Sequence, residues 1–243
     1  MWAIYKKELS SFFGSLTAYI VIGVFLVMTG LFLWLFPSTS VIEYSYATLD
    51  SFFYLAPSLF VFLIPAITMR SFAEESQKRT IELLMTKPLS DWEIILGKYF
   101  AYLTLVVFAL LPTLIYYFSI YQLGAPKGNI DAGAVLGSYT GLFLLAAVFV
   151  AIGIFASALS KNQVVAFVIA TILSFLVFWG FDFISALPVF WGVWDDFIQK
   201  LGINYHYLSI SKGLLDTRDI LYFISLTAVF LLLTEFVFKQ KRY

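Results

Sequence analysis

Hydrophobic and polar positions divide the chain into long apolar runs separated by short polar segments. Six of these runs are about twenty residues long, which is the length an α-helix needs to cross the hydrocarbon core of a bilayer. The predicted spans are residues 16–36, 51–69, 99–121, 135–159, 164–184 and 219–238. Backbone groups find no water inside lipid, so each run is predicted to be a helix, and the short alternating segments of a β-barrel are missing. The fold predicted for residues 1–243 is one all-α integral membrane domain with six transmembrane helices.

The residues before the first span show an amphipathic pattern. Tyr5, Leu9, Phe12 and Leu16 recur at helical spacing and form an apolar stripe, while Glu8 and the neighbouring polar residues fall off that stripe. This pattern is typical of a helix that lies in the membrane interface. We therefore predict an N-terminal interfacial helix that turns into the first span.

Composition supports a membrane protein and excludes several functions. The 243 residues are 61% hydrophobic and only 12% charged, whereas a soluble domain carries about 25% charged residues. The formal net charge is zero, which argues against a nucleic-acid partner because such partners require a basic face. There are no cysteines, so disulfides and thiolate metal sites are excluded. The apolar run after Lys6 and Lys7 is too long for a signal peptide, and we expect it to be retained as a span.

Lysine and arginine residues predict the orientation. The N-terminus, residues 70–98, the loop at Lys161 and the C-terminal tail together hold eleven of the fifteen, and the other connections hold four. Positive charge marks the cytoplasmic side. Both termini and residues 70–98 are therefore expected in the cytoplasm.

Residues 185–218, on the expected outer side, are rich in aromatic side chains. Such side chains favour the level of the lipid headgroups. Two interpretations stay open for this segment: an ordinary loop anchored by its aromatic residues, or a re-entrant hairpin.

Residues 70–98 form the most polar long segment and hold ten of the thirty charged residues, five of each sign. Ile81, Leu84 and Met85 share a helical face, and a Lys78–Glu82 pair would support the same helix. Pro88 is expected to end this helix near residues 86–87. A capping box over residues 90–93 then predicts a second helix that continues into the third span.

Two roles are open for this helix–break–helix segment. It could be a solvated loop whose charges only keep it out of lipid. However, a loop that only needs water does not need the apolar run at residues 81–85, and balanced charge suits a protein partner better than anionic lipid, which favours net basic charge. Docking to a cytoplasmic partner is the more specific hypothesis.

These residues resemble the cytoplasmic coupling region of ABC-2-type permeases. The matching positions are Glu75, Arg79, Thr80, Glu82, Leu83, Leu84, Thr86, Pro88 and Leu89, followed by Gly97-Lys98. Residues 157–166 are similar to the family's loop between the fourth and fifth spans, and residues 1–9 look like its interfacial helix. Residues 52–57 and 64–75 are similar to the gliding-motility-associated branch. One departure is the stretch of residues 77–81, where relatives commonly have a glycine before the threonine.

The resemblance implies a permease subunit of the bacterial inner membrane that pairs with a cytoplasmic ABC ATPase, which would bind ATP and Mg²⁺, so no cofactor is expected in this chain. Residues 70–98 would receive the movement of that ATPase, with Glu74 beside the matching positions. A second permease or an auxiliary membrane subunit is a further expected partner, as is membrane lipid. The chain has no Walker-type motif, so it is not expected to be an enzyme.

Other candidate sites are weak. His206 is the only histidine, and a single histidine without cysteines does not build a metal site. No catalytic residue is predicted. Gly133, Gly137 and Gly141 form GxxxGxxxG at the start of the fourth span, a spacing that lets helices approach closely. The approaching helix could belong to the same chain or to a second subunit.

Two further functions make different demands on the sequence. A multi-span enzyme acting on lipid would need histidine, aspartate or arginine residues gathered at one interface, and the spans supply none. An ATP-independent channel or secondary transporter would need polar or broken helices meeting near the midplane of the membrane. This second function stays as the alternative to an ATP-driven permease.

Overall fold

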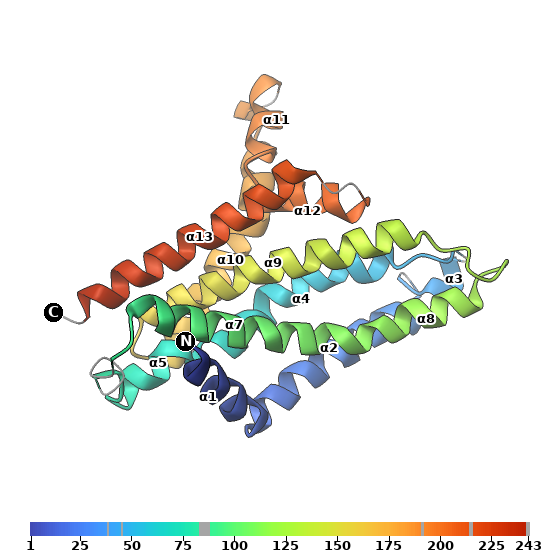
Figure 1. Ribbon diagram of the computed structural model, residues 1–243. Helices are drawn as coiled ribbons and strands as arrows, with labels where there is room; N and C mark the ends of the chain where they lie inside the picture. The colour runs from blue at the N-terminus through green and yellow to red at the C-terminus, as the bar shows by residue number, and fades with distance from the viewer. Residues whose placement is uncertain (38, 45, 83–87, 191, 214–215, 242–243) are drawn as a thin grey trace.

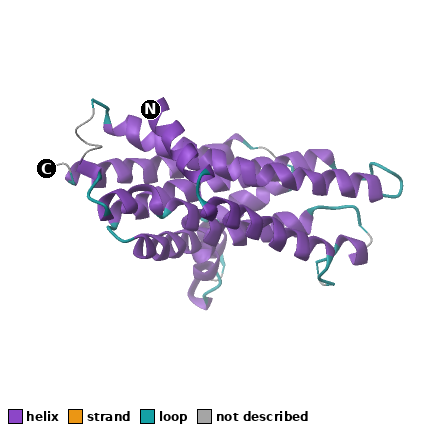
Figure 2. Ribbon diagram, turned by 90° about the horizontal axis from the view of Figure 1, so that it is seen from below, coloured by secondary structure: helices purple, strands orange, loops and turns teal. Residues whose placement is uncertain are grey.

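The computed structural model describes residues 1–37, 39–44, 46–82, 88–190, 192–213 and 216–241. These residues form an elongated bundle of helices joined by short connections, with no strand among them (Figures 1 and 2). In chain order the helices are α1 (Trp2–Phe13), α2 (Leu16–Trp34), α3 (Val41–Tyr44), α4 (Asp50–Thr68), α5 (Arg70–Gln77), α7 (Asp91–Leu110), η1 (Leu111–Thr113), α8 (Leu114–Leu123), α9 (Ala132–Leu159), α10 (Gln163–Ser185), η2 (Pro188–Phe190), α11 (Val193–Gln199), α12 (Ile203–Ser211) and α13 (Thr217–Gln240).

The predicted spans are confirmed. In the described part of the chain, six helical stretches are long and apolar enough to cross a membrane: Leu16–Trp34, Asp50–Gln77, Asp91–Leu123, Ala132–Leu159, Gln163–Ser185 and Thr217–Gln240. The second and third stretches are longer than the apolar runs because α5 extends the second and the polar start of α7 extends the third. The fold class is therefore an all-helical membrane protein.

Helix α9 forms the centre of the bundle. It packs against α4, α5, α7, α10, α12 and α13. Of the residues in its most apolar 18-residue stretch, 72% are buried, compared with 22% in the corresponding stretches of α2, α10 and α13. Small residues allow this close packing. At Gly153 an added Cβ would overlap the Thr68 side chain of α4, so the backbone of α9 lies directly against that side chain.

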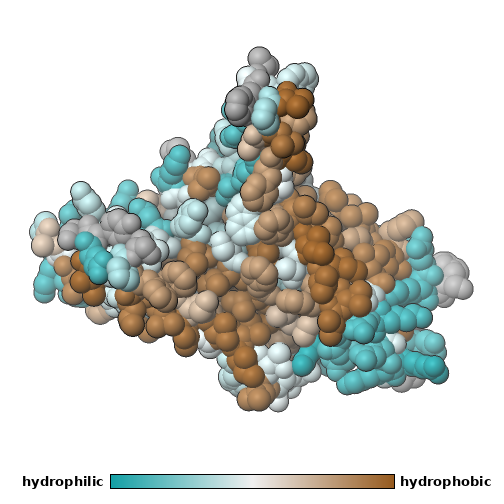
Figure 3. All heavy atoms as spheres, turned by 180° about the vertical axis from the view of Figure 1, so that it is seen from behind, coloured by the Kyte–Doolittle hydropathy of each residue, from teal (hydrophilic) through white to brown (hydrophobic). Residues whose placement is uncertain are grey.

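The two ends of the bundle differ in composition. One end carries both termini, α1, α5 and the start of α7, and is called the basic end below (Figure 1). Figure 3 shows a broad apolar surface over the middle of the molecule and a large hydrophilic patch at the basic end. This distribution fits a bundle that sits in lipid and presents a polar surface where α1 and α5 lie.

Residues 185–218 fold into helices. Helix α11 projects from the bundle beyond α10 (Figure 1), while α12 packs on α9, α10 and α13. Tyr207 of α12 donates a hydrogen bond of 2.6 Å to the carbonyl oxygen of Phe53 in α4, and both residues are buried. The interpretation of this segment as an ordinary loop is therefore wrong for α12, because α12 is a helix whose buried face packs on α9.

Candidate functional site

Four charged side chains from three helices meet at the basic end. Lys98 of α7 places its Nζ 2.9 Å from Glu8 Oε1 of α1 and 3.1 Å from Glu75 Oε2 of α5. Lys7 of α1 completes the group, with its Nζ 2.9 Å from Glu75 Oε1 and 3.6 Å from Glu8 Oε1. We call these four residues the charge cluster. It connects three helices that are far apart in the sequence.

The centre of the charge cluster is Lys98, whose side chain is only 1% exposed. A buried ammonium needs partners for its three protons. Lys98 donates hydrogen bonds to Glu8 Oε1 and, at 2.6 Å, to the carbonyl oxygen of Ser71, and its third neighbour is the Glu75 carboxylate. The ring of Phe72 lies 4.9 Å from Nζ, a distance at which a cation is attracted to the ring face. The Lys98 ammonium group is therefore surrounded by two carboxylates, a carbonyl oxygen and an aromatic ring.

Lys7 lies at the outer edge of the charge cluster and is more exposed. Partial burial by itself would lower the pKa of Lys7, but the hydrogen bond and negative charge of Glu75, together with Glu8, raise it above the ordinary lysine value. Lys7 therefore stays protonated at neutral pH and holds α1 to α5.

The start of α5 is also fixed to α9. Ser157 Oγ of α9 accepts hydrogen bonds from the backbone N–H groups of Phe72 and Ala73, at 2.9 and 3.0 Å, and donates one to the carbonyl oxygen of Met69. Free N–H groups at the start of a helix need such acceptors. Through Ser157, the segment that carries the charge cluster is joined to the central helix of the bundle.

The structure has a break in residues 70–98 that the sequence does not predict. Helix α5 ends at Gln77, and residues 78–80 leave the helical conformation before a helical stretch resumes at Ile81. Lys78 pairs with Glu74 at 2.6 Å, so the predicted Lys78–Glu82 pair is wrong: the chain turns between the two residues. The predicted helix end near residues 86–87 lies outside the described residues.

Arg79 occupies the turn with φ of 55°. This left-handed conformation costs an ordinary residue about 1–2 kcal/mol, whereas glycine adopts it freely. We therefore expect Arg79→Gly to raise the free energy of unfolding by about 0.5–1 kcal/mol, part of the relief being offset by the greater freedom of glycine in the unfolded chain. Chemical unfolding in detergent measures the change. Arg79→Ala is the matched control because it keeps the Cβ; an equal gain from alanine would contradict the explanation.

The predicted docking residues are therefore placed in different environments. Glu75 is 12% exposed and its carboxylate contacts Lys7 and Lys98, so it is engaged within the chain. Arg79, Thr80, Glu82 and Pro88 are exposed. Glu74 is partly exposed and pairs with Lys78. Leu83, Leu84 and Thr86 lie outside the described residues.

The start of α7 is formed as predicted. The Ser90 hydroxyl accepts the N–H of Glu93, and the Glu93 carboxylate accepts the N–H of Ser90. This capping box satisfies two backbone donors at once. It sets the point at which α7 begins, two turns before Lys98.

The glycine stripe of α9 lies partly against α12. An added Cβ at Gly137 would be 2.9 Å from Gly213 Cα and from the carbonyl oxygen of Ile210, and one at Gly141 would be 3.2 Å from the Ile210 side chain. At Gly133 the nearest atom is the Asp131 carboxylate that caps α9. The close approach at Gly137 and Gly141 is thus to a helix of the same chain.

His206 lies at the junction of α12 and α13. Its Nδ1 is 2.7 Å from Asp219 Oδ1, its Nε2 is 3.0 Å from the carbonyl oxygen of Lys200, and its ring stacks on Tyr222. Both ring nitrogens therefore face hydrogen-bond acceptors. In the described ranges no group of three or more potential metal-ligating side chains was found. His206 has a structural environment that joins α12 to α13.

The sequence missed the buried role of Glu8 and Lys98. Hydrophobic periodicity assigns Glu8 to the polar side of the N-terminal helix, but α1 buries Ile4, Glu8 and Phe12. The three residues recur at spacings of four, so a helical stripe through Glu8 was present in the sequence. The charge of Glu8 hides this stripe, because a charged residue is buried only when it has a partner. The partner of Glu8 is Lys98, ninety residues away in the sequence.

Comparison with known families decides what kind of membrane protein this is. The sequence model of a family described as ABC-2 family transporter protein matches residues 36–203, more than two thirds of the chain. The chain belongs to this family. Membership makes it the multi-pass membrane subunit of a transporter and implies an ABC ATPase as a partner. No protein of curated function matches the chain.

The part of this ABC-2 transporter subunit that matches the family includes α5, residues 78–98 and the glycine stripe of α9. It leaves out α1, α2, most of α12 and α13. The charge cluster therefore joins a segment inside the match, which carries Glu75 and Lys98, to a helix outside it, which carries Lys7 and Glu8.

Proposed function

We propose that this ABC-2 permease couples to a separate cytoplasmic ATPase through residues 70–98. In this proposal the basic end faces the cytoplasm of a bacterium, both termini included, and the bundle spans the inner membrane. The ATPase binds ATP and Mg²⁺, and the permease itself holds no cofactor. The contact residues are the exposed ones on either side of the break after α5, with Leu83, Leu84 and Thr86 between them.

The observation that carries the proposal is the charge cluster. A docking segment transmits movement only if it is rigidly attached to the transmembrane helices. Here Glu75 and Lys98 flank residues 78–90 on both sides and contact each other at 3.1 Å. A push on the segment between them therefore moves α5 and α7 together, α1 follows through Glu8, and Ser157 carries the movement to α9.

A role in gliding motility is the narrower part of the proposal. It is supported by the similarity of residues 52–57 and 64–75 to that branch, and it includes a second permease or an auxiliary membrane subunit as partner. Deletion of the gene in its own bacterium tests this part: loss of surface movement with unchanged growth is the expected result, and normal movement would contradict it.

Coupling is tested by charge reversal at Glu82, which is exposed beside the break. In co-purification with the ATPase, Glu82→Lys is expected to weaken association at least tenfold, about 1.4 kcal/mol, and to lower permease-stimulated ATP hydrolysis. Glu43→Lys is the matched control, because Glu43 is an exposed glutamate in α3 at the opposite end of the bundle. If Glu82→Lys and Glu43→Lys associate equally with the ATPase, the coupling proposal is contradicted.

A further inference from the structure

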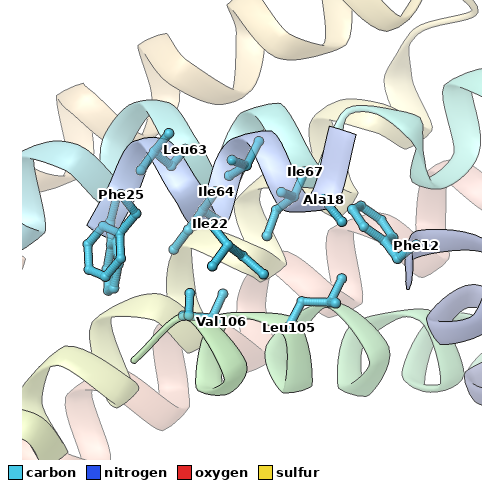
Figure 4. A pocket seen from close by; sticks show the side chains of 12 residues that line it. Phe12, Ala18, Ile22, Phe25, Leu63, Ile64, Ile67, Leu105 and Val106 are labelled. Carbon is cyan, nitrogen blue, oxygen red and sulfur yellow. The ribbon is translucent and has the colours of Figure 1, made fainter. Parts of the chain in front are cut away.

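The cleft between α2, α4 and α7 shows how apolar the interior of the bundle is. The twelve side chains that line it are all apolar, Phe12, Ile22 and Phe25 among them (Figure 4). Against this background, an acid and the only histidine of the chain lie together at the start of α13. The side chain of Asp219 is 8% exposed and that of His206 is 14% exposed. A carboxylate buried to this degree needs a partner.

Both ring nitrogens of His206 face groups that accept hydrogen bonds. Nε2 lies 3.0 Å from the carbonyl oxygen of Lys200, which only accepts, so Nε2 carries a proton. Nδ1 lies 2.7 Å from Asp219 Oδ1, and an ionised carboxylate also only accepts. A neutral imidazole has a single donor, so one of the two contacts would bring two lone pairs face to face. The doubly protonated ring satisfies both contacts.

The surroundings of His206 favour a positive charge on the ring. The Tyr222 ring stacks on the imidazole with the two ring centroids 4.0 Å apart, a distance at which an aromatic face attracts a cation. The other carboxylate oxygen, Asp219 Oδ2, is buried and accepts no hydrogen bond from any residue that the structure describes. The charge of Asp219 is therefore compensated by His206, and 2.7 Å is typical of a charge-assisted hydrogen bond.

The other titratable groups around this pair are engaged elsewhere or exposed. Asp182 of α10 accepts a hydrogen bond from Asn204, and the Lys200 ammonium pairs with Asp196 of α11. Helix α9 contributes no charged side chain within its bounds. Near the pair in the chain or in space lie also Tyr205, which meets the His206 ring edge-on, and the exposed Lys212, Asp216 and Arg218. Asp219 is therefore the acid that holds the proton on His206.

The pair joins three elements of the fold. His206 lies in α12, Asp219 in the first turn of α13, and Lys200 directly after α11. Loss of the ring proton would turn one of the two His206 contacts into facing lone pairs and would leave the buried Asp219 charge uncompensated, which is costly. The packing of α12 on α9 does not involve this pair, so the separation would occur between α12 and α13.

We propose that His206 and Asp219 form a proton-operated clasp, which holds α12 to the start of α13 while His206 is doubly protonated and opens when this proton is lost to alkaline solution. A histidine free in water loses its proton near pH 6.5, at about the middle of the physiological range. The folded chain then binds more protons than the unfolded chain above this pH, so the stability that the clasp provides is complete in mildly acidic solution and is lost as the pH rises. Only the side of the membrane that supplies the proton, the outer one, rests on the proposed function.

The test uses the full chain, purified in detergent without a histidine tag and without any ATPase, so its failure leaves the coupling proposal unaffected. Because the chain has one histidine, nitrogen-15 NMR of histidine-labelled protein shows a single pair of ring nitrogens. At pH 7.5 about one-tenth of a free histidine is protonated, whereas both nitrogens of His206 are expected to carry a proton in nearly every molecule. A ring with one protonated nitrogen at this pH overturns the proposal.

Asp219→Asn separates the charge of the acid from its shape. The amide can donate to Nδ1 of a neutral ring, so the clasp stays closed, and the protonated fraction of His206 should fall about tenfold at pH 7.5. Asp50→Asn, a change at an exposed aspartate in the first turn of α4, is the matched control and should leave both protons in place. Equal protonation of His206 in the two variants contradicts the proposal. If Asp219→Asn is not obtained folded, the wild-type spectrum decides.

A distance measurement tests the opening itself. The chain has no cysteine, so spin labels can be attached at Leu208→Cys in α12 and Leu221→Cys in α13, both of which are exposed positions. The distance between the labels is expected to increase between pH 6.5 and pH 9 with the native Asp219 and to stay constant with Asp219→Asn. A distance that does not change with the native Asp219 would show that the proton does not operate the clasp.

Discussion

Replacement of Lys98 by methionine is expected to lower the free energy of unfolding of the ABC-2 permease by about 3–5 kcal/mol. Methionine has nearly the length of lysine but no charge and no donor. After the change, the nearest cation to Glu8, whose side chain is only 11% exposed, is Lys7 at 3.6 Å. The Ser71 carbonyl oxygen also loses its hydrogen-bond donor. Removing one member of a buried ion group is costly because the other charges stay buried without compensation.

Chemical unfolding of the purified protein in detergent measures this loss. Lys78→Met is the matched control: it removes the same side chain from the exposed pair with Glu74 and should cost no more than about 1 kcal/mol. The double variant Glu8→Gln with Lys98→Met should recover about 0.5–3 kcal/mol, because the two residues interact directly. If Lys98→Met costs no more than Lys78→Met, the charge cluster does not hold the basic end together.

The second large effect is expected at Gly153, where α9 meets α4. Gly153→Ala should destabilise the protein by about 1–3 kcal/mol, because the new methyl group would overlap Thr68 Oγ1 and lie 2.7 Å from Thr68 Cβ. Thr68 does not move away easily, since it is fully buried and its hydroxyl donates to the Ile64 carbonyl oxygen. The two helices must therefore separate.

Gly23→Ala is the matched control for this substitution. Gly23 is also a helical glycine, in α2, but an added Cβ there meets no atom within 4 Å. Alanine is the better helix former, so this variant should be neutral or more stable by up to about 1 kcal/mol. Adding Thr68→Ala to Gly153→Ala should restore part of the loss, because it removes the nearest atom. Equal melting temperatures for Gly153→Ala and Gly23→Ala would contradict the close contact.

The parts of the fold that could be predicted are those that depend on neighbours in the sequence. The spans follow from the length of the apolar runs, and the capping box at Ser90 and Glu93 needs only residues three apart. Pro88 is a strong local signal for the break predicted there, whereas the break after α5 was not predicted because the left-handed turn at Arg79 has no signal in an arginine. The family's preference for glycine before the threonine was the only indication of it.

The charge cluster could not be predicted because it depends on pairing over long distances. Glu8 and Lys98 are each charged residues inside a helix, and hydrophobic periodicity places such residues on the outside. Their burial is possible only when α1 folds back onto α7, which brings opposite charges together. For the same reason the sequence does not identify the partner of the glycine stripe, which at Gly137 is Ile210 of α12.

The central position of α9 has a consequence for how the protein is made. Helix α9 is the fourth span in chain order, yet it supplies the surface on which α4 and α7 pack from before it and α10 and α13 from after it. A nascent chain whose first three spans have entered the bilayer therefore lacks the helix that most of them contact. Although α2 and α4 pack on each other, α4 and α7 lack the surface of α9 until residue 159 has been synthesised, and truncation before this point should leave membrane-inserted chains that remain sensitive to protease.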